Sequence, residues 1–232
     1  MGDYTMNRLK RHITIFIIIL LPVFGNAQIF TGVEGLLNVP SAELSSANSM
    51  RIGAHYVNTD FVPNGFSMDS PLAFHISLTP YKWVEASYMV LMWKKDDTYL
   101  PDRSLSVKLQ PLKEGKWWPA LVVGGFDIWG TSLNKNFYAA TVKHFNGLGG
   151  EWGVNVAYRH YFKENSEDKW GGLVGGLTFR PKFYRDLRAT VEYDGCEFNI
   201  GVDAKYKIFR VQFILQDWKK VSVGLCLEFS DL

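Results

Sequence analysis

Two-residue alternation of apolar and polar side chains is the feature that most constrains the fold of this chain. It is clearest at the C-terminal end, where apolar residues from Val221 to Phe229 alternate with Ser222, Gly224, Cys226 and Glu228. No stretch of more than about ten residues after the N-terminal region shows helical periodicity. Alternating segments cover approximately residues 50–58, 71–79, 82–93, 103–111, 119–129, 137–145, 151–162, 170–180, 184–194, 196–207, 209–217 and 220–229. The sequence therefore predicts an all-β fold of twelve strands.

The connections between these segments indicate how the strands are joined. Short breaks rich in turn residues include Asn146–Gly150, Asp194-Gly195 and Asp217–Lys220. Longer polar breaks occur at residues 59–70, 94–102 and 163–169. An even number of strands, with short turns and longer loops, is typical of a transmembrane antiparallel β-barrel in an outer membrane.

A soluble β-sandwich or a lipocalin-like barrel would also alternate, so the two environments must be weighed. Three observations favour the membrane barrel. Charged side chains occur in the middle of strands on the polar faces, and the last strand ends within three residues of the C-terminus. In addition, aromatic residues occur at strand ends. Strand-end aromatics suit a membrane interface because their rings are apolar and their tips polar. They include Tyr81, Trp83, Trp93, Tyr99, Trp117, Trp118, Trp129, Tyr161, Trp170, Tyr184 and Trp218.

The N-terminal residues have the composition of an export signal. Arg8, Lys10 and Arg11 precede an unbroken apolar run, residues 13–21, which is too short to span a bilayer as a helix. We expect residues 1–27 to be a signal peptide cleaved after Ala27, with residues 50–232 forming the barrel and residues 28–49 a segment between them. Since Gln28 would be the first mature residue, we do not expect a lipoprotein.

Charge and cysteine usage narrow the possible partners. Removal of residues 1–27 takes away three basic and one acidic residue and leaves 22 of each. A neutral chain has no basic excess to hold a nucleic-acid backbone, so we expect no nucleic-acid partner. Cys196 and Cys226 fall on opposite faces by strand parity, and we interpret them as ordinary strand residues, although a disulfide stays possible.

Three stretches of the sequence resemble a known family. They are "GLLNVPSAE" with "MRIGAHY" at residues 35–56, "SLSVKLQPLKEGKWWPALVVGGFDIWGT" at 104–131 and, more weakly, "VEYDGCEFNIGV" at 191–202. They are similar to segments of the YjbH-like family of outer-membrane proteins associated with exopolysaccharide production. The resemblance implies a non-enzymatic outer-membrane barrel of a diderm bacterium that supports secretion or surface assembly of a polysaccharide. It implies outer-membrane lipid, and with it polysaccharide and other secretion components, as partners.

The stretch before the first strand has a distinctive composition of small residues around a proline. Two roles are open for it: a plug that closes or lines the barrel mouth, or a tuck that closes the barrel seam. The residues that define this motif are Gly35, Leu36, Asn38, Pro40, Ser41 and Ala42.

An outer-membrane hydrolase is the rival functional class, because the mature chain contains His55, His75, His144 and His160. Such an enzyme needs a nucleophile hydrogen-bonded to a base. His75 shares a strand face with Ser77, whereas His144 and His160 fall on apolar-rich faces where we expect interfacial histidines. The sequence contains no HxxxH, CxxC or GxSxG motif, and we expect no metal or cofactor.

Charged residues on the polar strand faces are the candidate binding residues. Asp127 lies near a strand end, where it either contacts a glycan or caps backbone N–H groups near Gly130 and Thr131. Inside a polar barrel interior, charges must also pair with one another, so a structural role competes with ligand binding. The other candidates are Lys108, Arg188, Glu192 and Asp194.

Overall fold

The computed structural model describes residues 31–58, 69–95, 98–131, 134–162 and 171–230. The expected signal peptide lies outside these ranges. Within them, no helix is long and apolar enough to cross a membrane.

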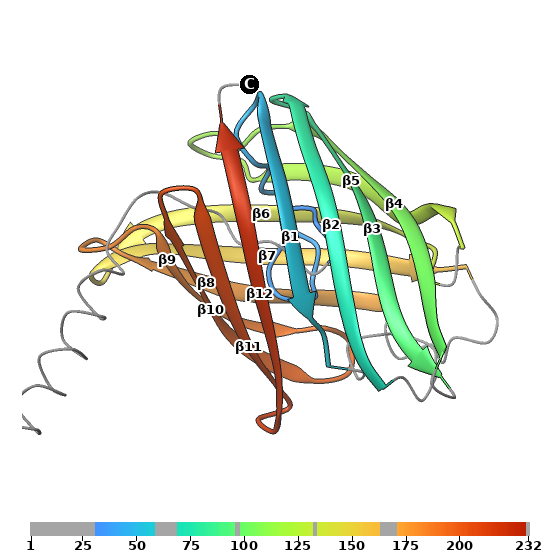
Figure 1. The fold of residues 1–232 in the computed structure, drawn as a ribbon. Helices are drawn as coiled ribbons and strands as arrows, with labels where there is room; N and C mark the ends of the chain where they lie inside the picture. The colour runs from blue at the N-terminus through green and yellow to red at the C-terminus, as the bar shows by residue number, and fades with distance from the viewer. Residues whose placement is uncertain (1–30, 59–68, 96–97, 132–133, 163–170, 231–232) are drawn as a thin grey trace, which may run out of the picture.

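Twelve antiparallel strands form one closed barrel, in which each strand pairs with its neighbours in sequence and β1 pairs with β12 (Figure 1). The strands are β1 Ser49–Tyr56, β2 Asp69–Tyr81, β3 Val84–Lys95, β4 Thr98–Leu112, β5 Ala120–Gly130, β6 Asn136–Gly147, β7 Gly150–Tyr161, β8 Gly172–Pro181, β9 Leu187–Tyr193, β10 Phe198–Tyr206, β11 Phe209–Gln216 and β12 Lys220–Ser230. The all-β class, the number of strands and the barrel architecture predicted from alternation are confirmed.

The barrel closes through direct pairing of its first and last strands. Eight consecutive pairs join β1 to β12, from Ser49 opposite Ser230 to Tyr56 opposite Val223. The other edge of β1 pairs with β2 over eight residues. Closure of the seam therefore needs no residue before Ser49.

Side chains alternate between the outer and inner faces along most strands. On β9, Val191 is 48% exposed on the outer face, whereas its neighbour Glu192 is 1% exposed on the inner face. On β12, Leu225 is outside and Cys226 is inside. The outer wall is apolar, because it carries most of the exposed leucine, valine, isoleucine and phenylalanine side chains.

The barrel interior is occupied by the chain that precedes β1, residues 31–48, which we call the N-terminal segment (Figure 1). Leu36, Leu37 and Val39 of this segment are at most 1% exposed. Gly176 and Gly201 on the barrel wall face it, and a Cβ atom at either position would lie 2.7 or 2.5 Å from the Leu36 or Leu37 side chain. The wall thus omits side chains where the segment fills the space.

Two expectations about local placement are wrong. The apolar face of β6 that carries Tyr138, Ala140 and Val142 points inward, so His144 is not interfacial. These side chains face inward because they pack on Leu36 and Val39 of the N-terminal segment. Cys196 lies in the turn between β9 and β10 and not in a strand, and both Cys196 and Cys226 are free thiols.

Candidate functional site

The candidate site is the barrel lumen, where the N-terminal segment meets charged residues on the inner wall. The segment turns back on itself between Gly35 and Pro40, which form an isolated antiparallel bridge. The Leu36 N–H donates to the Val39 carbonyl over 2.9 Å. Proline at residue 40 fits this place, since its fixed φ favours a turn and it donates no backbone hydrogen bond.

Glu192 on β9 holds the tip of this turn. Its carboxylate accepts hydrogen bonds from the backbone N–H groups of Leu37, Asn38 and Val39 at 2.9, 2.8 and 3.1 Å. Successive backbone N–H groups form a concave anion site, and hydrogen bonds to a carboxylate are stronger than those between neutral groups. Glu192 therefore binds the backbone of the N-terminal segment instead of pairing with a cation on the barrel wall.

Asp194 and Arg159 hold the side chain and carbonyl of Asn38. The Asn38 amide donates to Asp194 over 3.4 Å, and Arg159 donates to the Asn38 carbonyl over 3.1 Å. Arg159 also donates to the Asp194 carbonyl over 2.8 Å. The Asp194 carboxylate in addition accepts the N–H groups of Cys196 and Glu197, so it orders the β9–β10 turn as well.

Arg188, the inward residue of β9 nearest its start, binds the segment from the opposite side. It donates to the Gly35 carbonyl over 2.6 Å and to the Glu43 carboxylate over 2.7 Å. Its Nε–H group donates to the Asp203 carboxylate on β10 over 3.0 Å. A fully buried guanidinium is costly unless its donors are matched, and here two of the partners come from the N-terminal segment.

A second charged cluster surrounds Glu34. Arg51 on β1 lies between the carboxylates of Glu34 and Glu85 and contacts both. Lys108 on β4 donates to the Glu34 carbonyl over 2.7 Å and lies 3.5 Å from Glu85. All four side chains are at most 1% exposed, so the charges in this network are shielded from water and contact one another instead.

Glu43 makes the third set of contacts, near the end of the segment. Its carboxylate contacts Arg180 at 2.9 Å, Arg188 at 2.7 Å and the Nε2 atom of His144 at 2.9 Å. Burial on its own would raise the pKa of Glu43, but Arg180, His144 and Arg188 together hold that pKa well below its ordinary value. The other ring nitrogen of His144 contacts Glu114 at 2.6 Å.

Four of the five predicted binding residues, Lys108, Arg188, Glu192 and Asp194, converge on the N-terminal segment. The motif residues Gly35, Leu36, Asn38, Pro40 and Ala42 are the other side of this interface, and Ser41 is buried within it. Arg51, Arg159 and Glu43 complete the site and are not among the residues predicted from the sequence. Strand alternation could have identified Arg51 and Arg159, because both occupy inward positions of alternating strands.

Asp127 lies apart from this group, near the end of β5. By simple parity it would share the outer face with Leu121 and Val123, yet it is fully buried. The pairing of β4 with β5 shifts between Leu105 and Val107, and Asp127 has a positive φ of 53°. This irregularity redirects the side chain, whose carboxylate accepts the Asn134 N–H over 2.8 Å.

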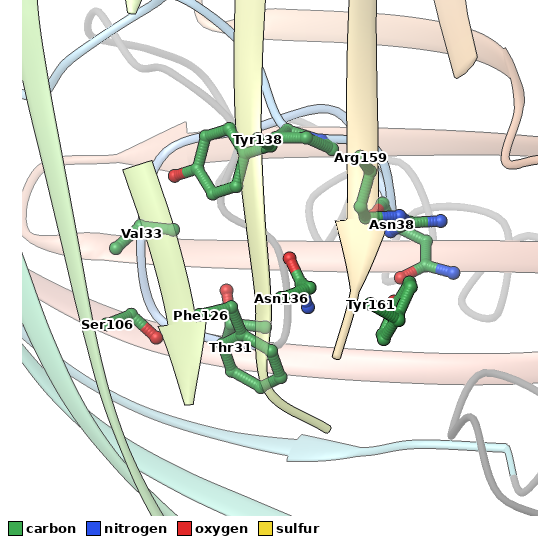
Figure 2. Close-up of a pocket in the computed structure, with 10 residues that line it drawn as sticks. Thr31, Val33, Asn38, Ser106, Phe126, Asn136, Tyr138, Arg159 and Tyr161 are labelled. Carbon is green, nitrogen blue, oxygen red and sulfur yellow. Dashed lines mark hydrogen bonds between the residues drawn. The ribbon is translucent and has the colours of Figure 1, made fainter. Parts of the chain in front are cut away.

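A cavity lies between the N-terminal segment and the inner wall (Figure 2). It offers a volume of about 30 Å³ to the centre of a water-sized probe and is partly open to solvent. The hydroxyls of Thr31 and Ser106 are buried at its edge, and within the part of the chain that the structure describes they have no hydrogen-bond partner. The lining residues are Thr31, Val33, Asn38, Pro40, Ser106, Phe126, Asn136, Tyr138, Arg159 and Tyr161.

Two of the histidines, His55 and His75, lie against one another on neighbouring strands. The rings of His55 and His75 stack with centroids 5.2 Å apart, and neither ring nitrogen of His75 has a hydrogen-bond partner among the described residues. Ser77, the proposed nucleophile beside His75, donates its hydroxyl to the Gly32 carbonyl. Over the described ranges, no group of three or more His, Cys, Asp or Glu side chains is placed to hold a metal ion.

Comparison with known proteins places this architecture in a family context. The family described as "Exopolysaccharide biosynthesis protein YbjH" matches residues 27–213. That range includes the N-terminal segment and all strands from β1 to β10. A comparison with curated proteins gives no match.

Proposed function

Because the chain belongs to the YjbH family of exopolysaccharide biosynthesis proteins, we propose that it is an outer-membrane barrel that supports secretion or surface assembly of an exopolysaccharide. The proposed role is non-enzymatic. It requires a membrane-embedded wall, a lumen whose opening is controlled, and a place where the polysaccharide makes contact.

The outer wall supports membrane insertion. Outward side chains in the middle of the strands are apolar, such as Val154 and Val156 on β7 and Phe213 on β11. Their inward neighbours are polar, such as Asn155 and Gln212. Apolar-out and polar-in alternation around a closed barrel is the arrangement that hydrocarbon requires.

The N-terminal segment is the proposed plug. The observation that carries this role is the set of wall charges that bind it: Glu192, Arg188 and Lys108 all contact backbone atoms of the segment. These contacts depend on the path that the backbone of the segment follows, and they do not depend on any single side chain of the segment. Release of the segment would expose these charges to water and give a polar passage suited to a hydroxylated polymer.

The cavity in Figure 2 is the proposed place of contact with a sugar unit. It offers about 30 Å³ to the centre of a water-sized probe, well below the roughly 300–1,000 Å³ of small-ligand pockets, so a sugar unit would enter only after the N-terminal segment moves. The rings of Phe126 and Tyr138 offer apolar surface, and the unpaired hydroxyls of Thr31 and Ser106 offer hydrogen bonds. Since four of its lining residues come from the segment, a ligand here would act on the plug. Asp127, next to Phe126, stays a candidate at the edge of this contact.

The proposal is tested in a diderm bacterium that carries the gene. Deletion of the gene should reduce extracellular polysaccharide and increase polysaccharide retained in the envelope, and the full chain should restore export. The tagged protein should remain in the outer-membrane fraction after a salt wash. Unchanged export in the deletion strain, or recovery of the chain in the salt-washed soluble fraction, would contradict the proposed function.

The plug is tested separately in planar bilayers. A variant that lacks residues 31–45 keeps β1 and its pairing with β12, so it should insert and conduct ions, whereas the full chain should be nearly silent. Equal conductance of the two proteins would exclude a plug role for the segment.

A further inference from the structure

One end of the barrel carries large apolar side chains on the tips of its turns. This is the end where β1 begins and β12 ends, and the hairpins β2–β3, β4–β5, β6–β7, β8–β9 and β10–β11 all turn there (Figure 1). Each of the five turns exposes at least one such residue. They are Trp83, Trp117 and Trp118, Leu148, Phe183 and Ile208.

The exposure of these side chains is extreme for their type. Trp117 is 82% exposed, Leu148 is 92% exposed and Phe183 is 86% exposed. Turn tips that project into water are normally polar, and grouped exposed apolar residues mark a surface that contacts something else. Burial of large apolar side chains is favourable, so covering all five tips would be a strong driving force for contact.

Cations accompany the apolar residues in four of the five turns. Lys82 precedes Trp83, Lys116 precedes Trp117, Lys182 precedes Phe183 and Lys207 precedes Ile208. All four lysines are exposed, and within the described part of the chain none of them forms an ion pair with an acidic residue. Lys116 instead lies 5.2 Å from the centre of the Trp117 ring.

The acidic side chains at this end that form ion pairs do so with cations other than these four lysines. Glu114 contacts Lys143 and His144, and Glu151 contacts Arg180. The surface is therefore both apolar and cationic, with each lysine beside an apolar residue. We call the turns at residues 82–83, 113–118, 148–149, 182–185 and 207–208 the basic rim.

We infer that the basic rim binds the headgroups of anionic phospholipids in the membrane leaflet at this end of the barrel. Tryptophan and lysine are the side chains that suit this layer, because the ring enters the acyl boundary while the ammonium group reaches the phosphate. The neighbouring outer wall is already apolar, so the rim continues a surface proposed to be in contact with lipid. This inference rests on the membrane insertion given under the proposed function, and it adds a preference for anionic over neutral phospholipids.

The test uses the full chain in vesicles and the quenching of its tryptophans by brominated lipids. At equal mole fractions, brominated phosphatidylglycerol should quench the wild-type protein more strongly than brominated phosphatidylcholine. Raising the salt concentration should reduce this difference, since exposed charges are screened. Quenching by brominated phosphatidylcholine alone reports insertion, so failure to insert is distinguished from lack of preference.

A pair of charge-matched variants locates the effect. Lys116→Gln with Lys182→Gln should reduce the preference about fivefold for each charge removed, because a cation near an anionic surface contributes about 1 kcal/mol. Lys219→Gln with Lys220→Gln removes two cations from the β11–β12 turn at the opposite end and should leave the preference unchanged. Equal quenching of the wild-type protein by both lipids at low salt would overturn the inference, and the rim would then suit an acidic protein partner.

Discussion

Glu192 accepts the backbone N–H of Asn38 over 2.8 Å, although the two residues are 154 positions apart in the sequence. The same carboxylate accepts the N–H groups on either side, from Leu37 and Val39. Together these contacts attach the tip of the N-terminal segment to the middle of the barrel wall. The Glu192 carboxylate thus holds the segment, and without the segment it would lose these three hydrogen bonds.

The first prediction concerns this attachment. Glu192→Gln keeps the size of the side chain, but it removes the charge and points amide hydrogens toward backbone N–H groups. We expect the segment to be bound about 2 kcal/mol more weakly, which corresponds to a roughly thirtyfold larger open fraction. Single-channel recording in planar bilayers should show more frequent opening.

Glu228→Gln is the control for this experiment. Glu228 is also an inward carboxylate, but its contacts are Lys205 and Arg210 on the wall. Its substitution should destabilise the barrel without raising the open fraction. If the two variants open equally often, Glu192 does not hold the segment.

Alternation predicted the barrel well because neighbouring residues point to the outer and inner faces of the wall, and these faces differ in polarity. On β9 and β12 the two faces differ sharply in polarity, so facing could be assigned from the sequence. On β6 both faces are apolar, since the lumen there contacts Leu36 and Val39 and not water. Facing could not be assigned on β6 without knowledge of what fills the barrel.

Several residues of the site were predicted from the sequence, but the atoms that they contact were not. Lys108, Arg188 and Glu192 were identified because charges in mid-strand must be matched. Their partners are mostly backbone atoms of the segment, and a sequence pattern does not identify backbone partners. Asp127 was expected near a strand end and is buried there, but the shift in pairing between Leu105 and Val107 that turns it inward could not be predicted from alternation.

The second prediction concerns the buried cluster around Arg51. Arg51→Met removes the cation between Glu34 and Glu85 and leaves two buried carboxylates without their main partner. We expect the free energy of unfolding to fall by about 3–5 kcal/mol. Urea unfolding in detergent, followed by heat-modifiable migration on a gel, would measure this loss.

Arg103→Met is a suitable comparison, because Arg103 is exposed on β4. Its free energy of unfolding should stay within about 0.5 kcal/mol of the wild-type value. Similar stabilities for the two variants would mean that the cluster around Arg51 adds little to the fold.

The third prediction concerns the outer wall. Val191 is 48% exposed on the outer face of β9, so Val191→Arg would place a cation in hydrocarbon. Near the bilayer midplane this should cost about 2–4 kcal/mol of stability in lipid vesicles. Val191→Leu should cost much less, and equal folding yields for the two variants would argue against a lipid-facing wall.

The last prediction is that acid loosens the N-terminal segment through Glu43. The folded-state pKa of Glu43 is held well below its ordinary value of 4.5, because Arg180, His144 and Arg188 surround the carboxylate. A group with a lowered pKa contributes its stabilisation fully above the unfolded pKa and loses it as the pH falls through the folded pKa. The open fraction of the wild-type channel should therefore be constant near neutral pH and rise below about pH 4.5.

Glu43→Gln should be more open at neutral pH, and its further response to acid should be smaller. Glu151→Gln serves as the control, since Glu151 shares Arg180 with Glu43 but lies on β7 and not on the segment. It should keep the wild-type acid response, and a Glu43→Gln channel with that same response would show that another group senses the acid.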